Sequence, residues 1–336
     1  MKIVIITTGQ PSTNPRMLKE VDALLSKDFE VKVLYSYWAS WAFETDKKII
    51  GQYPKNTFTE VGGNPFTAKT DYFLARIIQK TALKLGTVLP FLSDYPISRN
   101  SFFLTRIAKK QKADLFIAHN IGALPAAVKA AKKQNALCGF DAEDYHRGEY
   151  VKPEGVNYLL TKKLEDKYLS CCDYITAASP LIAKAYETIA SKKKVTVIHN
   201  VFSKKNLQPI RQLLQNEGLK IFWFSQTTGP HRGLEFVINA INKLTQYNIS
   251  LHLMGNVSVE YREQLENMSD KQNIFFLPPV SPDKIFSIAA LYDIGLAAEV
   301  PCNDNRNLCL TNKLFTYLLA GNFILASDTF WYRGNI

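Results

Sequence analysis

The sequence gathers polar side chains in short segments that directly follow apolar runs. The densest follows the run at 136–140 and holds Asp141, Glu143, His146 and Arg147. Carboxylates accept hydrogen bonds from sugar hydroxyls, and His and Arg donate them, so this composition suits a carbohydrate ligand. The alternative is a solvated loop that caps the next helix. No H-E-x-x-H spacing occurs, and we therefore expect no metal site.

Two further segments of the first half carry candidate ligand-binding groups. His119 follows the apolar run at 114–118, where an imidazole can bond a phosphate or a sugar hydroxyl, although a lone histidine is more often structural. Near the N-terminus, Gly9 lies in a loop that meets a helix start carrying Arg16, which makes an anion or sugar site possible. Asn14 and the following proline also make an ordinary helix start, and the two interpretations are equally supported. The loop has no G-x-G-x-x-G pattern, so a dinucleotide site is not indicated.

The second half has two segments of the kind that bind phosphates. The stretch from Ser225 to Gly233 contains Thr227, Gly229 and Arg232, and a glycine-bearing loop with an arginine at a helix start can hold a diphosphate. Farther on, a polar loop at 299–307 precedes a helix that opens with Asn312 and Lys313. Lys313 can reach phosphate oxygens from there, and the alternative is an ordinary surface lysine.

These segments are separated by strands and helices that alternate along the chain. We predict strands at 2–7, 31–35, 114–118, 136–140, 174–177, 195–198, 220–224, 250–254, 274–277, 294–298 and 323–326. We predict helices at 15–26, 71–89, 124–134, 158–170, 234–244, 259–268, 282–290 and 312–320, and a further helix start at 179–180. This alternation is typical of doubly wound parallel sheets, which bind ligands beyond the carboxyl ends of their strands. A polar stretch at 203–218 is the predicted linker between domains at 1–202 and 219–336.

Composition limits the function classes. The chain has 336 residues, is 46% hydrophobic and carries a net charge of +11. It has no apolar run long enough to cross a bilayer, no signal-peptide pattern at its start and no metal-ligand spacing among its five cysteines, so we expect a cytosolic protein. The basic residues are spread along the chain without a nucleic-acid motif, which favours phosphate-bearing ligands over nucleic acid.

The segment 71–89 is a predicted basic amphipathic helix. Phe73 and Ile77 lie on it with Arg76, Lys80 and Lys84. Such a helix can lie in an anionic membrane surface, on the inner face of the cell membrane in this case. The alternative, a helix packed on the domain edge, is the stronger of the two because amphipathicity alone discriminates poorly.

Three stretches resemble the retaining glycosyltransferases of family four, which have the B-type fold. They lie at 119–149, 176–202 and 305–328. The third is the most specific, since it is similar to the signature K-L-x-E-Y-x-x-x-G-x-P-V-I-A-S-D, with Lys313, Leu314, Tyr317, Gly321 and 324–328 in matching places. The resemblance covers nearly the whole chain in element order.

The resemblance implies two Rossmann-like domains facing a cleft, with a nucleoside-diphosphate sugar bound in the second domain and the acceptor facing the first. It also implies retention at the anomeric carbon and no cofactor or metal. His119 would lie near the reacting sugar, with Arg232 and Lys313 at the phosphates. The implied donor-side residues are Ser225, Thr227, Gly229, Arg232, Glu299, Asn307, Asn312, Lys313 and Thr316, and the acceptor-side residues are Gly9, Asn14, Arg16, Asp141, Glu143, His146 and Arg147.

The sequence departs from the family pattern in three places. The family's paired glutamates are replaced by Leu308 and Thr316, for which Glu299 or Asn307 is a candidate substitute. The first arginine of the diphosphate loop has no counterpart near Thr227. The chain also ends one strand after the signature, so we expect the second domain to be incomplete.

We therefore expect a hexosyl-type glycosyltransferase that acts on a glycan or lipid-linked acceptor in cell-envelope polysaccharide synthesis. One alternative is a truncated, inactive homologue that binds sugar or a partner. The other is a nucleotide-sugar epimerase of the same fold, which would need Glu143 or Glu299 as a base.

Overall fold

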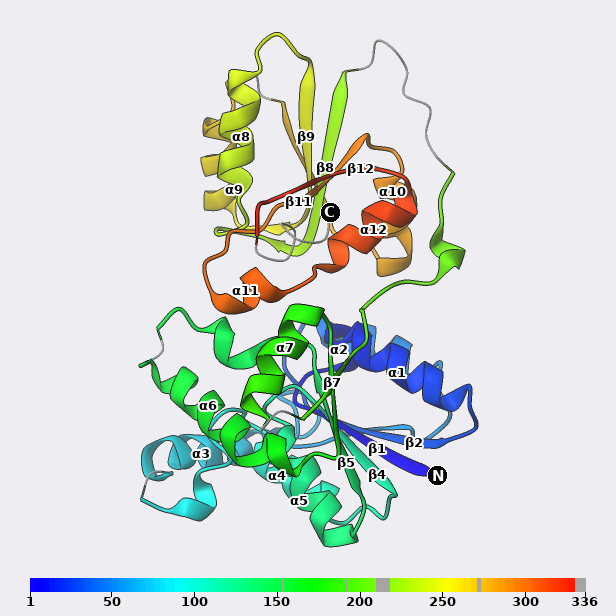
Figure 1. Ribbon diagram of the computed structural model, residues 1–336, viewed down its shortest axis with the longest axis vertical. Helices are drawn as coiled ribbons and strands as arrows, with labels where there is room; N and C mark the ends of the chain where they lie inside the picture. The colour runs from blue at the N-terminus through cyan, green and yellow to red at the C-terminus, as the bar shows by residue number, and fades with distance from the viewer. Residues whose placement is uncertain (87, 153, 191–192, 210–217, 271–272, 330–336) are drawn as a thin grey trace. The chain divides into compact units, whose positions relative to one another are not determined.

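The computed structural model describes residues 1–86, 88–152, 154–190, 193–209, 218–270 and 273–329. The chain divides into two compact units, Met1–His199 and Asn200–Ile336 (Figure 1). Of the predicted linker, 210–217 lie outside the described residues, while 203–209 and 218 belong to the second unit.

The first unit is built on a parallel sheet that has seven strands among the described residues, in the order β3-β2-β1-β4-β5-β6-β7. The strands are β1 (Lys2–Thr7), β2 (Glu30–Tyr35), β3 (Phe58–Glu60), β4 (Leu115–His119), β5 (Leu137–Ala142), β6 (Tyr174–Ala177) and β7 (Val195–Val197). The helices are α1 (Pro15–Leu25), α2 (Ala42–Ile50), α3 (Lys69–Leu85), α4 (Ser101–Ala108), α5 (Leu124–Gln134), α6 (Val156–Tyr168) and α7 (Pro180–Ile189). Short 3-10 helices lie at η1 (Pro11–Thr13), η2 (Pro90–Leu92), η3 (His146–Glu149) and η4 (Leu169–Cys171).

The second unit has a parallel sheet of five strands within the described residues, in the order β10-β9-β8-β11-β12. The strands are β8 (Leu219–Thr228), β9 (Ile249–Val257), β10 (Ile274–Leu277), β11 (Ile294–Ala297) and β12 (Phe323–Ala326). The helices are α8 (Leu234–Lys243), α9 (Val259–Asn267), α10 (Ile285–Ala289), α11 (Asp304–Leu308) and α12 (Asn312–Ala320), with 3-10 helices η5 (Lys204–Asn206) and η6 (Pro282–Lys284).

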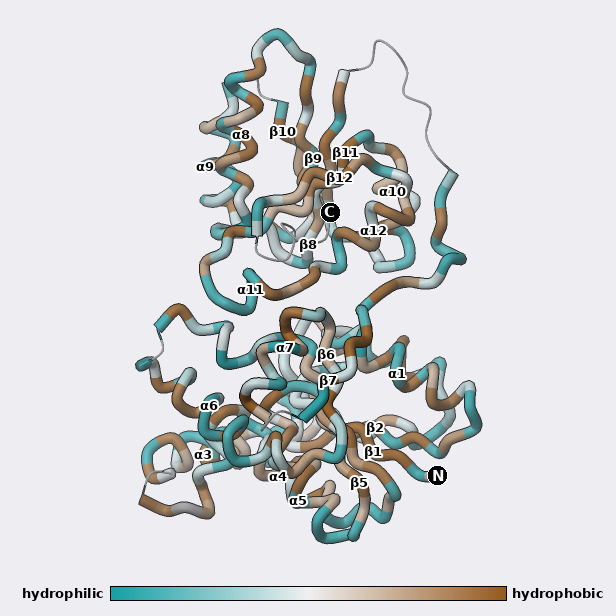
Figure 2. The backbone as a smooth tube through the Cα atoms, in the orientation of Figure 1, coloured by the Kyte–Doolittle hydropathy of each residue, from teal (hydrophilic) through white to brown (hydrophobic). Residues whose placement is uncertain are grey.

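Apolar strands and capped helices explain why the chain adopts this order. Residues 3–6 of β1 are fully buried, and β1 forms a largely brown, hydrophobic segment in Figure 2. Asn14 caps α1 by accepting a hydrogen bond from the backbone N–H of Met17, and Ser179 caps α7 in the same way. At the end of α5, Asn135 adopts a left-handed conformation that stops the helix and turns the chain into β5.

Several elements differ from the prediction. The strand predicted at 220–224 runs on to Thr228, because β9 is also longer and Thr227 and Thr228 pair with Asn256 and Val257 across a bulge. Ser225 and Thr227 therefore lie in a strand, and the prediction that they belong to a loop was wrong. The predicted polar loop at 299–307 contains most of α11, and the helix predicted at 282–290 begins as a 3-10 turn. The helix predicted at 71–89 ends at Leu85, and α2, β3 and α4 were not predicted.

Candidate functional site

Parallel pairing brings polar side chains together at the carboxyl edge of the first sheet. His119, the last residue of β4, pairs with Asp141 of β5, and Asp141 pairs with Thr176 of β6. The helix that follows β1 adds Arg16 and Glu20 to the same edge. His119 and Asp141 thus lie at the carboxyl ends of their strands, where doubly wound sheets bind ligands.

Arg16 and Asp141 form a buried, two-point ion pair. Arg16 Nε and Nη2 lie 2.6 and 2.7 Å from the two carboxylate oxygens of Asp141, and Nη1 donates to the backbone oxygen of Ile198 at 2.6 Å. Burial raises the pKa of Asp141, but the hydrogen bond from Arg16 and the charge of His119 outweigh it and hold this pKa below its usual value. Arg16 thus has a structural partner on each side of its guanidinium.

His119 is fully buried, and both ring nitrogens contact carboxylates. Nδ1 lies 2.7 Å from Glu143 Oε1, and Nε2 lies 2.5 Å from Glu20 Oε2. Burial lowers the pKa of the imidazole, but the hydrogen bonds to Glu143 and Glu20 raise it to about 10, so the ring is a cation at neutral pH. The predicted open approach to His119 is therefore blocked in this structure, because Glu20 reaches across from α1. Its placement near a reacting sugar stays a prediction.

Asn14 makes the helix start that was one of the two interpretations of this loop, and its role in an anion or sugar site stays a prediction. Its side-chain oxygen caps α1, while its amide donates to Glu143 Oε1 at 2.5 Å. The carboxylates of Glu143 and Glu20 remain 23% and 30% exposed. The exposed part of this cluster is therefore acidic, with the cations behind it.

The other predicted acceptor-side residues have separate surroundings. Gly9 accepts a hydrogen bond from the backbone of Ser36, outside the cluster. His146 is buried with Nδ1 2.8 Å from Glu149, which raises its pKa to about 9 against the opposing effect of burial. Arg147 pairs with Glu165 and, at 2.6 Å, with Asp166 of α6.

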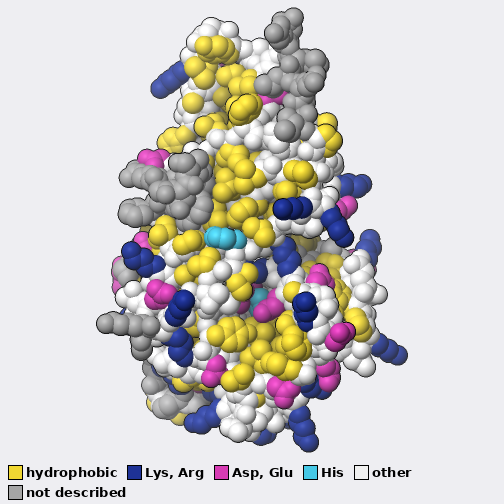
Figure 3. All heavy atoms as spheres, turned by 45° about the vertical axis from the view of Figure 1, so that its right-hand side comes forward, with side chains coloured by type: hydrophobic (Ala, Val, Ile, Leu, Met, Phe, Trp, Pro, Cys, Tyr) yellow, Lys and Arg dark blue, Asp and Glu magenta, His cyan; other side chains and the backbone are white. Residues whose placement is uncertain are grey.

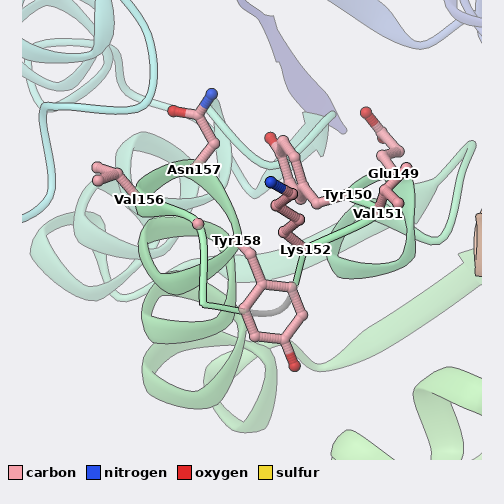
Figure 4. Close-up of a pocket in the computed structure, with 8 residues that line it drawn as sticks. Glu149, Tyr150, Val151, Lys152, Val156, Asn157 and Tyr158 are labelled. Atoms are coloured by element: carbon pink, nitrogen blue, oxygen red, sulfur yellow. The ribbon is translucent and has the colours of Figure 1, made fainter.

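A hollow of about 440 Å³ lies next to this segment (Figure 4). It is lined by residues of one stretch that runs from η3 into α6, including Tyr150, Lys152, Asn157 and Tyr158. No side chain of the carboxyl-edge cluster, by which we mean Arg16, Glu20, His119, Asp141 and Glu143, lines it among the described residues.

His119, Asp141 and Glu143 offer possible metal-ligating atoms within 4.8 Å of one another. These atoms are already engaged, since Arg16 occupies both oxygens of Asp141 and the imidazolium occupies Glu143. A metal ion would compete with two fixed positive charges here, so the surroundings do not fit one.

The second unit places one buried carboxylate among three basic side chains of the described residues. Glu299 Oε1 accepts from Lys313 Nζ at 2.8 Å, and Oε2 lies 3.0 Å from Arg306 Nη1 and 3.6 Å from Arg232 Nη1. The Glu299 backbone N–H donates to Ser327 Oγ, which fixes the residue just beyond β11. We call these four residues the Glu299 cluster.

The Glu299 cluster has a formal charge of +2 and lies where helices begin. Arg232 directly precedes Gly233, the N-cap of α8, and Lys313 is in the first turn of α12. Helix N-termini present free N–H groups and a positive dipole end, and both favour anions. Burial lowers the pKa of Lys313, and the positive charge of Arg232 lowers it further. The negative charge of Glu299 raises this pKa, but not enough to restore its usual value. A phosphate group would relieve the excess positive charge.

Three predicted donor-side residues are not members of the Glu299 cluster. Thr316 is buried and its hydroxyl donates to the backbone oxygen of Asn312 at 3.2 Å, so it offers no open face to a ribose. The backbone N–H of Asn307 donates to the backbone oxygen of Asn303, the N-cap of α11. Around Gly229 a side chain would meet nothing within 4 Å, so this loop borders open space.

Sequence reasoning missed Arg306 and Glu20. Arg306 lies in the polar segment that was singled out, and the start of α11 directs it to Glu299. Glu20 follows Arg16 by one helical turn, which was the available signal.

Among the described residues, no helix is both long and apolar enough to cross a membrane. No protein-family model and no curated protein matches the sequence. Solved structures do match. HepE of Anabaena in complex with UDP-glucose has a TM-score of 0.63 at 15% identity, with 98% of this chain and 81% of that chain covered. Sucrose-phosphate synthase of Thermosynechococcus elongatus has a TM-score of 0.66 at 11% identity, with 98% and 82% covered.

A protein of Listeria monocytogenes described as a UDP-N-acetylglucosamine 2-epimerase has a TM-score of 0.51 at 13% identity, with 88% of this chain and 73% of that chain covered. At such identities the likeness concerns the fold alone. Across the described residues, two α/β units with parallel sheets of seven and five strands match the fold of these structures. The chain therefore has the two-domain α/β architecture of the glycosyltransferase B fold.

Proposed function

We propose that this protein is a glycosyltransferase that moves a sugar from a nucleoside-diphosphate sugar to a glycan or lipid-linked acceptor. The observation that carries the proposal is the Glu299 cluster, in which Lys313, Arg306 and Arg232 surround one carboxylate at the carboxyl edge of the second sheet. The structure of HepE, which has the same fold, contains UDP-glucose. A diphosphate is the part of such a donor that this charge suits.

The chemistry requires stabilisation of a leaving group. The bond between the anomeric carbon and the diphosphate oxygen breaks, and the electron pair stays on that oxygen. The acceptor oxygen bonds the carbon, and its proton passes to water. Negative charge thus develops on the diphosphate, where fixed cations lower the barrier most effectively. Arg232 and Lys313 are the proposed catalytic residues on this side, with Arg306 beside them.

Glu299 is the proposed positioning residue. Its two oxygens hold Lys313 on one side and the two arginines on the other. Because charged side chains that repel each other would otherwise move apart, the carboxylate keeps three long side chains in one place before the donor binds. The cations, rather than a metal ion or cofactor, would neutralise the diphosphate.

For the acceptor side we propose that Glu143 and Glu20 accept hydrogen bonds from sugar hydroxyls. Both are partly exposed, and the buried His119 imidazolium holds them from behind. Hydroxyl groups donate well to carboxylates, and the contact with His119 holds both carboxylates in place. Retention at the anomeric carbon is the stereochemistry that the family resemblance implies.

The helix α3 supports a role at the cytoplasmic face of a membrane, in envelope polysaccharide synthesis. Phe73 and Ile77 are 59% and 60% exposed, on the side opposite the buried Ala75 and Ala82. Lys80 and Lys84 share the exposed side. An apolar stripe flanked by lysines fits an anionic lipid surface, where lipid-linked acceptors are found.

The test is transfer from a panel of UDP- and GDP-sugars to crude lipid and glycan acceptors, followed by detection of the free nucleotide. We expect one donor to be consumed by the wild-type protein and transfer to fall at least a hundredfold in Arg232→Ala. Arg262→Ala on α9 is the matched control, because Arg262 pairs with Glu266 on an exposed helix face. Full turnover in Arg232→Ala would sink the assignment.

Two other outcomes separate the alternatives. Binding of a nucleotide sugar without turnover of any donor would indicate an inactive homologue that binds sugar or a partner. A changed sugar nucleotide without any acceptor would indicate an epimerase, the activity named for one protein of this fold.

A further inference from the structure

A second concentration of positive charge lies in the first unit, away from the carboxyl-edge cluster. A hollow of about 330 Å³ is lined by Arg106, Lys109, Lys110 and Lys133 together with the rings of Tyr95 and Phe102. Tyr95 lies in the segment before α4, Phe102 and Arg106 lie on α4, and Lys109 and Lys110 directly follow it. Lys133 lies in the last turn of α5, and α4 and α5 pack together (Figure 1). We call it the α4–α5 hollow.

The hollow lies toward the amino-terminal edge of the sheet. Lys109 and Lys110 directly follow α4 and precede β4, while Lys133 is near the end of α5, which precedes β5. His119 and Asp141, in contrast, lie at the opposite ends of β4 and β5. A ligand here would therefore be separate from the proposed acceptor side.

No acidic side chain lines the hollow among the described residues. The neighbouring carboxylate in the sequence, Asp94, is buried and already accepts hydrogen bonds from Lys129, Lys167 and Tyr168 at 2.6, 2.8 and 2.7 Å. The negative charge of Asp94 is therefore paired with Lys129 and Lys167 and not with the lysines of the hollow. Across the face in Figure 3, by comparison, basic and acidic side chains are interspersed.

Helix dipoles do not account for this grouping. Basic residues near the ends of α4 and α5 do complement the negative dipole ends. Lys132 complements the dipole of α5 as well as Lys133 does, yet of the two only Lys133 lines the hollow. Like charges gathered around one hollow repel each other unless an anion lies between them.

We propose that the α4–α5 hollow binds a phosphate group carried by a small ester or a lipid headgroup. Arg and Lys side chains together suit phosphate, since Arg binds two oxygens at once and Lys supplies a compact charge. The edge-to-face rings of Tyr95 and Phe102, with centroids 5.4 Å apart, give the hollow an apolar wall. Such a wall excludes water on one side and strengthens the attraction. The volume is at the lower end of the range for small-ligand sites.

The experiment uses pyridoxal 5′-phosphate, which combines a phosphate with an aldehyde that forms an imine with a nearby lysine amine. After reduction with borohydride, tandem mass spectrometry locates the labelled lysines in the full chain. We expect stronger labelling of Lys109, Lys110 and Lys133 than of Lys132, and protection of these three by inorganic pyrophosphate. Equal labelling of Lys132 and Lys133 with no protection would overturn the proposal, as would equal protection by potassium chloride of the same ionic strength.

Arg106→Ala keeps the lysines available for labelling and removes one phosphate partner. We expect the pyrophosphate concentration that gives half-protection to rise about tenfold, as for the loss of one charged hydrogen bond. Arg232→Ala should leave the protection unchanged, which separates this site from the proposed donor site. An unchanged half-protecting concentration in Arg106→Ala would contradict the proposal.

Phosphatidylglycerol vesicles identify the source of the phosphate. Protection by pyrophosphate but not by vesicles of equal phosphate concentration assigns a soluble ester. Protection by vesicles at concentrations where pyrophosphate has no effect assigns a lipid headgroup, and protection by neither overturns the proposal.

Discussion

Lys313 Nζ lies 2.8 Å from Glu299 Oε1, and both side chains are at least nine-tenths buried. The pair joins the first turn of α12 to the end of β11, so it fixes a helix start against the sheet. The ammonium also lies 5.4 Å from the centroid of the Trp223 ring, within cation–π range. The sequence also allowed Lys313 to be an ordinary surface lysine, whereas in the structure it is part of the core of this unit.

Glu299→Gln should lower the free energy of unfolding by about 3 kcal/mol, because it leaves buried cations without their counter-charge. Thermal or urea unfolding followed by circular dichroism measures the loss. Added UDP should stabilise the variant more than the wild-type protein, since its phosphates replace the missing negative charge.

The double variant Glu299→Gln with Lys313→Met serves as the control for the buried pair. Removal of both charges, with similar side-chain volume, should restore much of the lost stability. If the double variant is as unstable as the sum of the single variants, the loss comes from packing and not from an uncompensated charge.

The meeting of His119, Asp141 and Thr176 was open to prediction from sequence. Parallel strands end at one edge, and the register of neighbouring strands then sets these residues side by side. The alternation of short apolar runs with amphipathic stretches was enough to place most strands and helices, since burial on both faces leaves a clear pattern.

Contacts made by helix-borne side chains were not open to prediction in the same way. Glu20 reaches His119, and Arg306 reaches Glu299, only because of how α1 and α11 are rotated against their sheets. α11 is a five-residue helix, too short to show a helical period. The length of β8 depends on its pairing with β9, a non-local contact that the local composition of Ser225 to Thr228 does not reveal.

The His119 imidazolium should make stability depend on pH. Its pKa is about 10 in the folded protein against an ordinary value of 6.5, because hydrogen bonds to Glu143 and Glu20 outweigh burial. A pKa raised by folding contributes stability that is complete below pH 6.5 and is lost as the pH rises toward 10. The free energy of unfolding should therefore fall across this window.

The measurement compares wild-type protein with His119→Gln in urea unfolding from pH 6 to pH 10. The difference between the two isolates His119, because His146 and the lysines titrate in both. We expect the difference to be largest near pH 6, on the order of 3 kcal/mol, and to shrink as the pH rises. A difference that stays constant with pH would show that folding does not shift the pKa of His119.

Phe73→Ser and Ile77→Ser should each weaken binding to phosphatidylglycerol vesicles by roughly tenfold, since each removes the insertion energy of one apolar side chain. Vesicle sedimentation at several salt concentrations measures this, and binding should weaken with salt because Lys80 and Lys84 contribute. Phe236→Ser on α8 is the matched control, as Phe236 is an exposed aromatic residue of the second unit. Equal binding of all three variants would remove α3 from the membrane proposal.

Arg306→Ala should raise the Kd for UDP about tenfold, as expected for the loss of one charge-assisted hydrogen bond. Arg306 Nη1 lies 3.0 Å from Glu299 Oε2 and also donates to the backbone oxygen of His231 at 3.0 Å, so it ties the loop before α8 to the cluster. Arg306→Lys should recover part of the affinity, because it restores the charge but not the second contact. Calorimetric titration with UDP gives the three constants, with Arg262→Ala as the control for loss of an exposed arginine. An Arg306→Ala variant that binds UDP as well as Arg262→Ala would mean that Arg306 only supports the fold, and the diphosphate would then depend on Arg232 and Lys313 alone.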